Sequence, residues 1–177
     1  MVSVVLTKTP PVYGNICQDV PALARSLGLE EEDLISQSLP PQVVSTGAAH
    51  LLVPVRNRQA VGRARPDAAQ LASLLHAMGG QGCYLFSLDP VSVLSTAHAR
   101  FFNPTVGIAE DSATGSAAGP LACQLVAHAI ARDGATVTIE QGHEMGRPSL
   151  LSVQVSGGSV RLAGRCVKVA DGTLRVR

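Results

Sequence analysis

Tryptophan is absent from this sequence of 177 residues, and three Phe and two Tyr are its only aromatic side chains. Charged residues make up only 15% against 46% hydrophobic residues, a composition that indicates a compact globular protein and excludes a disordered one. The fourteen basic residues, only two of them lysines, are scattered without a basic run, and the net charge is +1. The sequence therefore gives no support for nucleic-acid binding.

Long apolar runs and paired cysteines are also missing. No segment reaches the ~18 apolar residues of a membrane span, and the apolar start of the chain is too short for a signal peptide. The four cysteines, Cys17, Cys83, Cys123 and Cys166, form no CxxC pair, which favours reduced thiols. We therefore expect a cytoplasmic protein that has no membrane partner. The five histidines show neither HxxxH nor HxH spacing, so no metal site is expected.

The hydrophobic periodicity favours an α+β protein without internal repeats. It predicts helices over 19–29, 65–80 and 116–131, with a further turn at 30–35. Gly157-Gly158 is typical of a hairpin turn between two late strands. The strands are expected at 2–7, 41–47, 50–55, 83–88, 91–96, 99–104, 135–142, 149–170 and 173–177.

The stretch GIAEDSATGSAAGPLACQLVAHAI, residues 107–130, has an unusual composition at the start of a helix. The helix over 116–131 is apolar nearly all round, which predicts that it is buried on every side. His128 is then expected to be packed or to cap the helix. The buried N–H groups of its first turn need acceptors, and Asp111, Ser112, Thr114 and Ser116 are candidate caps.

Two interpretations of this helix N-terminus stay open on the residues alone. One is a capped structural helix with small residues for close packing. The other is an anion site that binds a carboxylate or phosphate, with Asp111 beside it as an orienting or proton-transfer group. Esterase, phosphate-loop and dinucleotide motifs all fail, because the required Gly and Lys positions are not matched. A second polar cluster, EQGHEMGRPS, predicts a turn with a local Glu144–Arg147 ion pair.

Three ordered blocks together resemble the PhzF-like (phenazine biosynthesis-like) family: PPQVVSTGAAHLLVPV, RFFNPTVGIAEDSATGSAAGPLACQL and QGHEMGRPSLLSVQV. The resemblance implies a fold like that of diaminopimelate epimerase, in which each lobe wraps a mixed sheet or barrel around a central buried helix. It also implies a cofactor-independent isomerase that moves a proton on a small carboxylic acid. On this resemblance Asp111 is the catalytic candidate, and Thr114, Gly115 and Ser116 bind the substrate carboxylate.

The chain departs from the family pattern in two ways. Ser112 stands where the family usually has Pro, and the resemblance begins partway through the pattern, so that the family's acid/base Glu and its accompanying His have no counterpart. We expect residues 1–18 to be a remnant strand and turn of the first lobe, and 19–177 to be the C-terminal lobe. Two hypotheses follow: a truncated, split or free-standing half of an isomerase that needs a second copy or a missing N-terminal-half chain, and a non-catalytic half that binds a small acid or only assembles.

Overall fold

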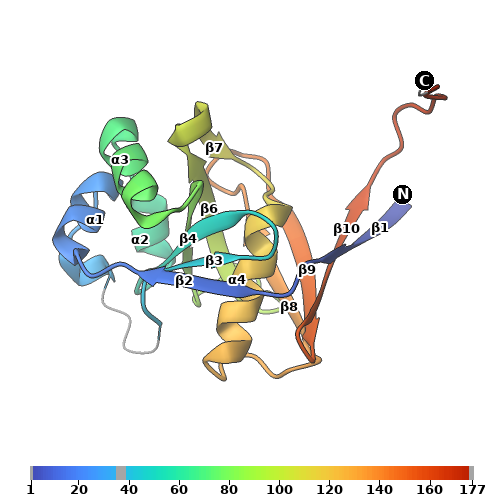
Figure 1. Cartoon of the computed structure of the whole chain (residues 1–177), viewed down its shortest axis with the longest axis horizontal. Helices are drawn as coiled ribbons and strands as arrows, with labels where there is room; N and C mark the ends of the chain where they lie inside the picture. The colour runs from blue at the N-terminus through green and yellow to red at the C-terminus, as the bar shows by residue number, and fades with distance from the viewer. Residues whose placement is uncertain (1, 35–38, 176–177) are drawn as a thin grey trace.

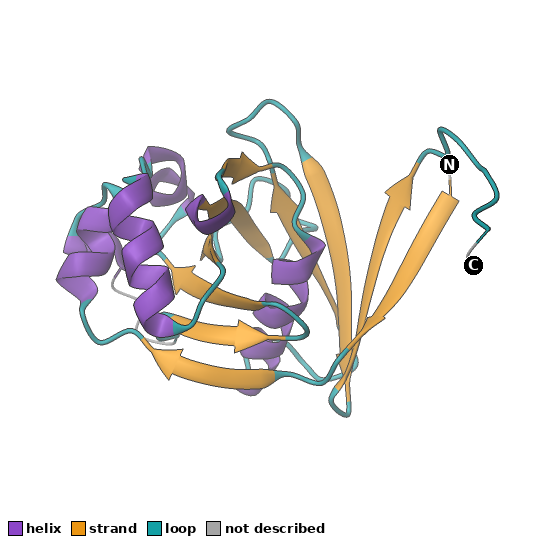
Figure 2. Cartoon of the chain, turned by 45° about the horizontal axis from the view of Figure 1, so that its top comes forward, coloured by secondary structure: helices purple, strands orange, loops and turns teal. Residues whose placement is uncertain are grey.

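The computed structural model describes residues 2–34 and 39–175, which form one mixed sheet with helices on both of its faces (Figures 1 and 2). The strand order is β1-β10-β9-β8-β6-β5-β4-β3-β2, and β7 pairs with β6 off this path. The strands are β1 (Val2–Lys8), β2 (Val12–Ile16), β3 (Gln42–Ser45), β4 (Ala49–Pro54), β5 (Gly82–Ser87), β6 (Ala97–Asn103), β7 (Ile108–Asp111), β8 (Thr136–Gln141), β9 (Ser149–Ser156) and β10 (Ser159–Cys166).

The sheet curves around helix α4 (Gly115–Ala127), which lies on its concave side (Figure 1). The pairs β4–β5 and β6–β8 are parallel and the others are antiparallel. Residues of α4 share one buried core with residues of β3, β4, β5, β6, β8, β9 and β10. Because the helix is apolar on all sides, a sheet that curves around it removes the most apolar surface from water. This confirms the expected α+β fold, in which a mixed sheet wraps around a central buried helix.

A second core lies on the other face of the sheet, under three shorter helices. These are α1 (Val20–Leu27), α2 (Arg58–Arg63) and α3 (Ala68–Met78), and the 3-10 turns are η1 (Glu31–Leu34) and η2 (Pro104–Val106). The sequence signals for α3 are confirmed, because the Asp67 side chain accepts from the Gln70 N–H and Gly79 ends the helix in the left-handed conformation. Its Leu71 and Leu75 are buried in this second core.

Some sequence expectations are wrong. No strand was expected over β2, because it lies at the edge with every residue exposed and so lacks an apolar alternation. The short helix α2 was also missed. Residues 91–96 form bends rather than the expected strand, with Val93 97% exposed, because the Glu140 carboxylate accepts the N–H groups of Val91 and Ser92. Residues 173–175 are not a strand, and the rest of that prediction lies outside the described residues.

The end of α4 also differs from the expectation. The helix ends at Ala127 rather than near Ala131, and His128 follows as its exposed C-cap residue, so the capping alternative is confirmed and the packed one is wrong. Its buried part runs from Ala117 to Leu125, as the apolar pattern predicts. None of the described helices is long and apolar enough to cross a lipid bilayer.

β1 and β10 form a two-stranded arm that projects from the body of the molecule (Figure 2). Val4, Val5 and Leu6 of β1 are 41%, 48% and 51% exposed. Because successive residues of a strand point to opposite faces, neither face of this part of the arm is fully covered. β1 and β2 both belong to the same sheet as the later strands. The assignment of residues 1–18 to a first lobe stays a prediction.

Candidate active site at the N-terminus of helix α4

The predicted site residues lie where β7 runs into α4. Asp111 is the last residue of β7 and pairs with Phe101 of β6, which fixes the position of its backbone. Thr114 is the N-cap residue of α4, and Gly115 and Ser116 are the first helical residues. The structure therefore places the four predicted residues around one partly buried helix end, at the junction of a strand with the central helix.

The expected side-chain cap is not formed. Thr114 Oγ1 donates to Asp111 Oδ2 over 2.8 Å, and within residues 2–34 and 39–175 no side chain accepts a hydrogen bond from the first turn of α4. The Thr114 carbonyl accepts from the N–H groups of Ala117 and Ala118. Among the described residues, the N–H groups of Gly115 and Ser116 have no acceptor. The positive end of the helix dipole thus presents two free donors.

Gln141 holds the segment in front of the helix. Its side chain is fully buried, and its Oε1 accepts from the Thr114 N–H over 3.1 Å and from the Tyr84 hydroxyl over 2.9 Å. Its Nε2 donates to the Asp111 carbonyl over 2.7 Å and to Thr114 Oγ1 over 3.0 Å. Burial, and then the charge of Asp111, raises the pKa of Tyr84 far above its ordinary value, so this hydroxyl stays a donor. The amide therefore fixes Thr114 and the backbone of Asp111 in one arrangement.

His50 of β4 reaches the same helix end from the other side. Its Nε2 lies 3.1 Å from Ser116 Oγ, and its Nδ1 is buried with no hydrogen-bond partner in the described part of the chain. Burial, and secondly the charge of Lys8, lowers the pKa of His50 to about 4. The imidazole is therefore neutral at neutral pH, and its contact with Ser116 orients that hydroxyl without adding charge to the site.

The turn after β8 packs against the loop before α4. Gly142 has φ 83°, and a Cβ there would lie 2.7 Å from the Ser112 carbonyl oxygen and closer still to that of Arg147. Ser149 Oγ donates to the same Ser112 carbonyl over 2.7 Å. The block EQGHEMGRPS, which the sequence alone indicates only as a polar turn, thus packs against the loop that leads into the predicted site.

Glu144 in this turn pairs with His98 rather than with Arg147, so the expected local ion pair is wrong. His98 Nε2 lies 2.8 Å from Glu144 Oε1, and its Nδ1 lies 2.8 Å from Glu140 Oε1. Burial alone would lower the pKa of His98, but the hydrogen bonds to Glu144 and Glu140 raise it above its ordinary value. The turn is thereby tied to β6 and β8 by charge as well as by packing.

Sequence reasoning did not identify Gln141, Tyr84 or His50 as parts of the site. Gln141 and His50 lie inside blocks that carry the family resemblance, so the blocks pointed to the right segments. The particular residues were not identified because Gln141 lies 27 residues from Thr114, and His50 lies 66 residues from Ser116. The roles of Asp111, Thr114, Gly115 and Ser116 in catalysis and binding stay predictions.

The comparison with known proteins decides the family. The sequence pattern of the family described as "Phenazine biosynthesis-like protein" matches residues 3–172. The chain belongs to this family.

Among solved structures, the PhzF-family phenazine biosynthesis protein of Bacillus anthracis superposes with a TM-score of 0.85 at 26% identity, covering 92% of this chain and 57% of that one. A predicted epimerase of Pseudomonas aeruginosa has a TM-score of 0.77 at 35% identity, covering 92% and 55%. The trans-2,3-dihydro-3-hydroxyanthranilate isomerase of Pseudomonas chlororaphis is 30% identical over 173 residues, which are 93% of this chain and 56% of that enzyme. This PhzF-family chain therefore spans about half the length of the curated relatives it matches.

Proposed function

We propose that this chain supplies the carboxylate-binding half of an isomerase that moves a proton on a small carboxylic acid by general acid–base catalysis. The chain is incomplete alone in this proposal, because the acid/base Glu of the family's first lobe has no counterpart in its sequence. A second lobe or chain would face the N-terminus of α4 and supply that group. The isomerase names of its relatives support the reaction class.

The free N–H groups of Gly115 and Ser116 carry the proposal. A carboxylate at a helix N-terminus gains both the helix dipole and the donors that the helix cannot use itself. In the tautomer of neutral His50 that carries its proton on Nε2, the imidazole donates to Ser116 Oγ, and the hydroxyl proton of Ser116 then serves as a third donor beside them. Gly115 is required by packing, since a Cβ there would lie 2.5 Å from Leu162 Cδ2 of the core. The three donors together favour a bound carboxylate over a helix end that is only packed.

Asp111 is the proton-transfer candidate in this half of the site. One of its carboxylate oxygens accepts from Thr114 Oγ1, and Gln141 holds its backbone carbonyl. The other oxygen, Oδ1, accepts from no described residue, and Asp111 is only partly buried. A carboxylate that is fixed on one side and free on the other can exchange a proton with an acid bound at the helix end.

The test measures deuterium incorporation from D₂O into trans-2,3-dihydro-3-hydroxyanthranilate, the acid that names the relative's enzyme. The chain is assayed alone and together with the separately produced first lobe of a full-length relative. We expect exchange only with the added lobe, and a loss of at least about 100-fold in Asp111→Asn. Asp171→Asn, at an exposed carboxylate, is the matched control. Absence of exchange under both conditions would refute the isomerase proposal.

Carboxylate binding is tested independently by calorimetry with the same acid. Gly115→Val and Ser116→Ala should each weaken binding, because the first displaces the start of α4 away from Leu162 and the second removes a donor. Binding that is unchanged in both variants would count against the helix-terminus site. Binding that is retained without exchange would instead support a non-catalytic half that holds a small acid.

The exposed arm favours a second candidate function, assembly through the β1–β10 ribbon. β1 is the edge strand at one end of the sheet, and its apolar side chains are about half exposed. An unpaired strand edge with apolar side chains is a template for association with another chain. We expect sedimentation of a dimer or larger species, and a shift to monomer in the double variant Val4→Thr, Leu6→Thr. Val12→Thr in β2 is the control, and a monomeric wild-type chain would refute this candidate.

A further inference from the structure

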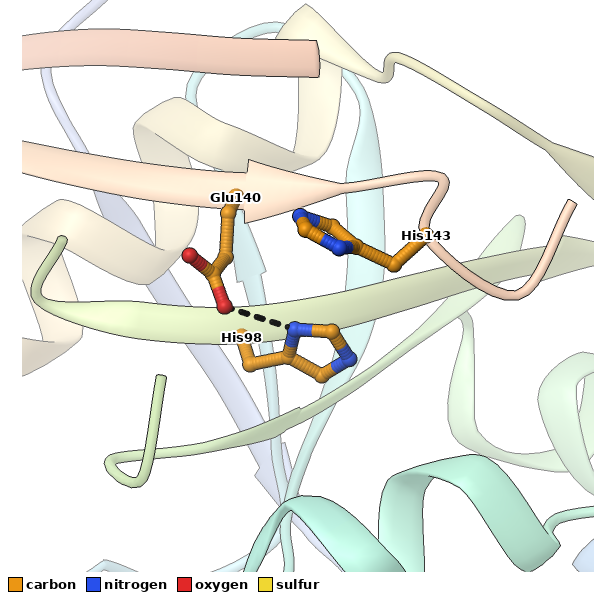
Figure 3. A group of neighbouring side chains, drawn as sticks. All are labelled: His98, Glu140 and His143. Carbon is orange, nitrogen blue, oxygen red and sulfur yellow. Dashed lines mark hydrogen bonds and ion pairs between the residues drawn. The ribbon is translucent and has the colours of Figure 1, made fainter. Parts of the chain in front are cut away.

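Three side chains that are far apart in the sequence face one another beside the turn after β8 (Figure 3). His98 comes from β6, Glu140 from β8 and His143 from the turn. Each offers one ligand atom, and these atoms all lie within 4.8 Å of one another. We propose that His98, Glu140 and His143 bind a divalent transition-metal ion of the zinc class.

The donor set suits this class of ion. Two imidazole nitrogens and one carboxylate oxygen form a common three-ligand set for zinc, and imidazole also suits copper, nickel and cobalt. Ligand atoms about 2.0–2.2 Å from a tetrahedral ion lie roughly 3.4 Å apart. His98 Nδ1 and Glu140 Oε1 are 2.8 Å apart and must separate slightly, whereas His143 must approach them from within 4.8 Å. Side-chain rotation at His143 can supply this movement because that residue lies in a turn.

The surroundings hold two of the ligands in place. Glu144 accepts from His98 Nε2 over 2.8 Å, which keeps a proton on that nitrogen and turns Nδ1 toward Glu140. A carboxylate behind a ligating imidazole is the usual arrangement in protein metal sites. The Glu140 carboxylate accepts from the N–H groups of Val91 and Ser92, so its position is also fixed.

An incoming ion takes the place of the proton that His98 Nδ1 shares with Glu140, and that proton leaves to solvent. Glu140 and His143 line a cavity of about 790 Å³, whose wall also includes Ser92 and Arg165. The ion and water can therefore reach the ligands. Three protein ligands leave a further coordination position, which water or an anion can occupy.

The competing interpretation is a metal-free ion triad. In that arrangement the protonated imidazole of His98 is held between Glu140 and Glu144, and His143 only packs against it edge-on, with ring centroids 5.3 Å apart. The two interpretations differ at His143. This residue is a ligand in the metal site and is dispensable in the triad.

The experiment uses the full chain, stripped with chelator and dialysed against Zn²⁺ at neutral pH, with bound metal measured by mass spectrometry. We expect one zinc per chain, and a Co²⁺-loaded protein whose absorption spectrum shows nitrogen and oxygen ligands without a thiolate band. His143→Gln should weaken zinc binding by at least about 100-fold, and Glu144→Gln by about 10- to 100-fold.

His128→Gln, at an exposed histidine at the end of α4, is the control for adventitious binding and should leave the affinity unchanged. Thermal unfolding of metal-free His143→Gln checks the fold, which should be retained because the His98 ion pairs do not involve this residue. No stoichiometric zinc, binding through thiolates, or wild-type affinity in His143→Gln would each overturn the proposal.

Discussion

Replacing Gln141 by leucine tests how the segment before α4 is held. The substitution keeps the approximate size of the side chain but removes all four of its hydrogen bonds. It leaves the Tyr84 hydroxyl and the Thr114 N–H buried without their partner, since Tyr84 is fully buried and Thr114 is 6% exposed. The Asp111 carbonyl is partly buried, so water can replace the amide there.

The magnitude follows from the two buried donors. A buried polar group that loses its partner costs about 1–3 kcal/mol, so the sum lies at about 2–6 kcal/mol before relaxation. We expect Gln141→Leu to lower the free energy of unfolding by about 3 kcal/mol. Urea unfolding measures this change, with the slope against denaturant checked for constancy. Carboxylate affinity should fall as well, because Thr114 precedes the two free N–H groups.

A double-mutant cycle makes the reasoning refutable. Tyr84→Phe alone should cost about 1 kcal/mol, and in the Gln141→Leu background it should cost less, since it removes the unpaired hydroxyl. Gln154→Leu, at an exposed glutamine of β9, is the matched control and should change stability by at most about 0.5 kcal/mol. A Gln141→Leu cost below about 1 kcal/mol, or fully additive effects with Tyr84→Phe, would refute the proposed role of the amide.

Two further predictions concern the surroundings of the site. Folding lowers the pKa of His50 from 6.5 to about 4, so on acidification the imidazole binds a proton in the unfolded chain at a higher pH than in the folded one. Stability is therefore lost as the pH falls from about 6.5 to 4. The wild type should lose up to about 3 kcal/mol more than His50→Gln over this interval in pH-dependent urea unfolding, and parallel curves would contradict the burial of a neutral imidazole. Gly142 and Gly146 both have positive φ, but only Gly142 is crowded, by the carbonyls of Arg147 and Ser112. In thermal unfolding, Gly146→Ala should lower the free energy of unfolding by about 1 kcal/mol, and Gly142→Ala should lower it by at least about 2 kcal/mol more. Equal losses would show that the turn does not pack closely against the loop before α4.

The sequence determined the elements whose signals are local. Asp67 and Gly79 delimit α3, and Gly157-Gly158 forms the turn between β9 and β10, because caps and turns depend on neighbouring residues only. The buried helix α4 followed from its apolar composition, and the family from three ordered blocks of residues. The edge strand β2 could not be predicted in this way, because its pairing with β3 is a contact between distant segments that leaves no alternation of exposure.

Only the tertiary structure decided which polar side chains meet. Gln141 and His50 contact the start of α4 from strands far away in the chain, so no local spacing indicates them. The same is true of His98 and His143, whose separation of 45 residues hides them from any search for metal-ligand spacing. The sequence determined which residues form the helix N-terminus. The curvature of the sheet around α4 determined which groups surround it, because a hydrogen bond forms only between atoms about 3 Å apart in space.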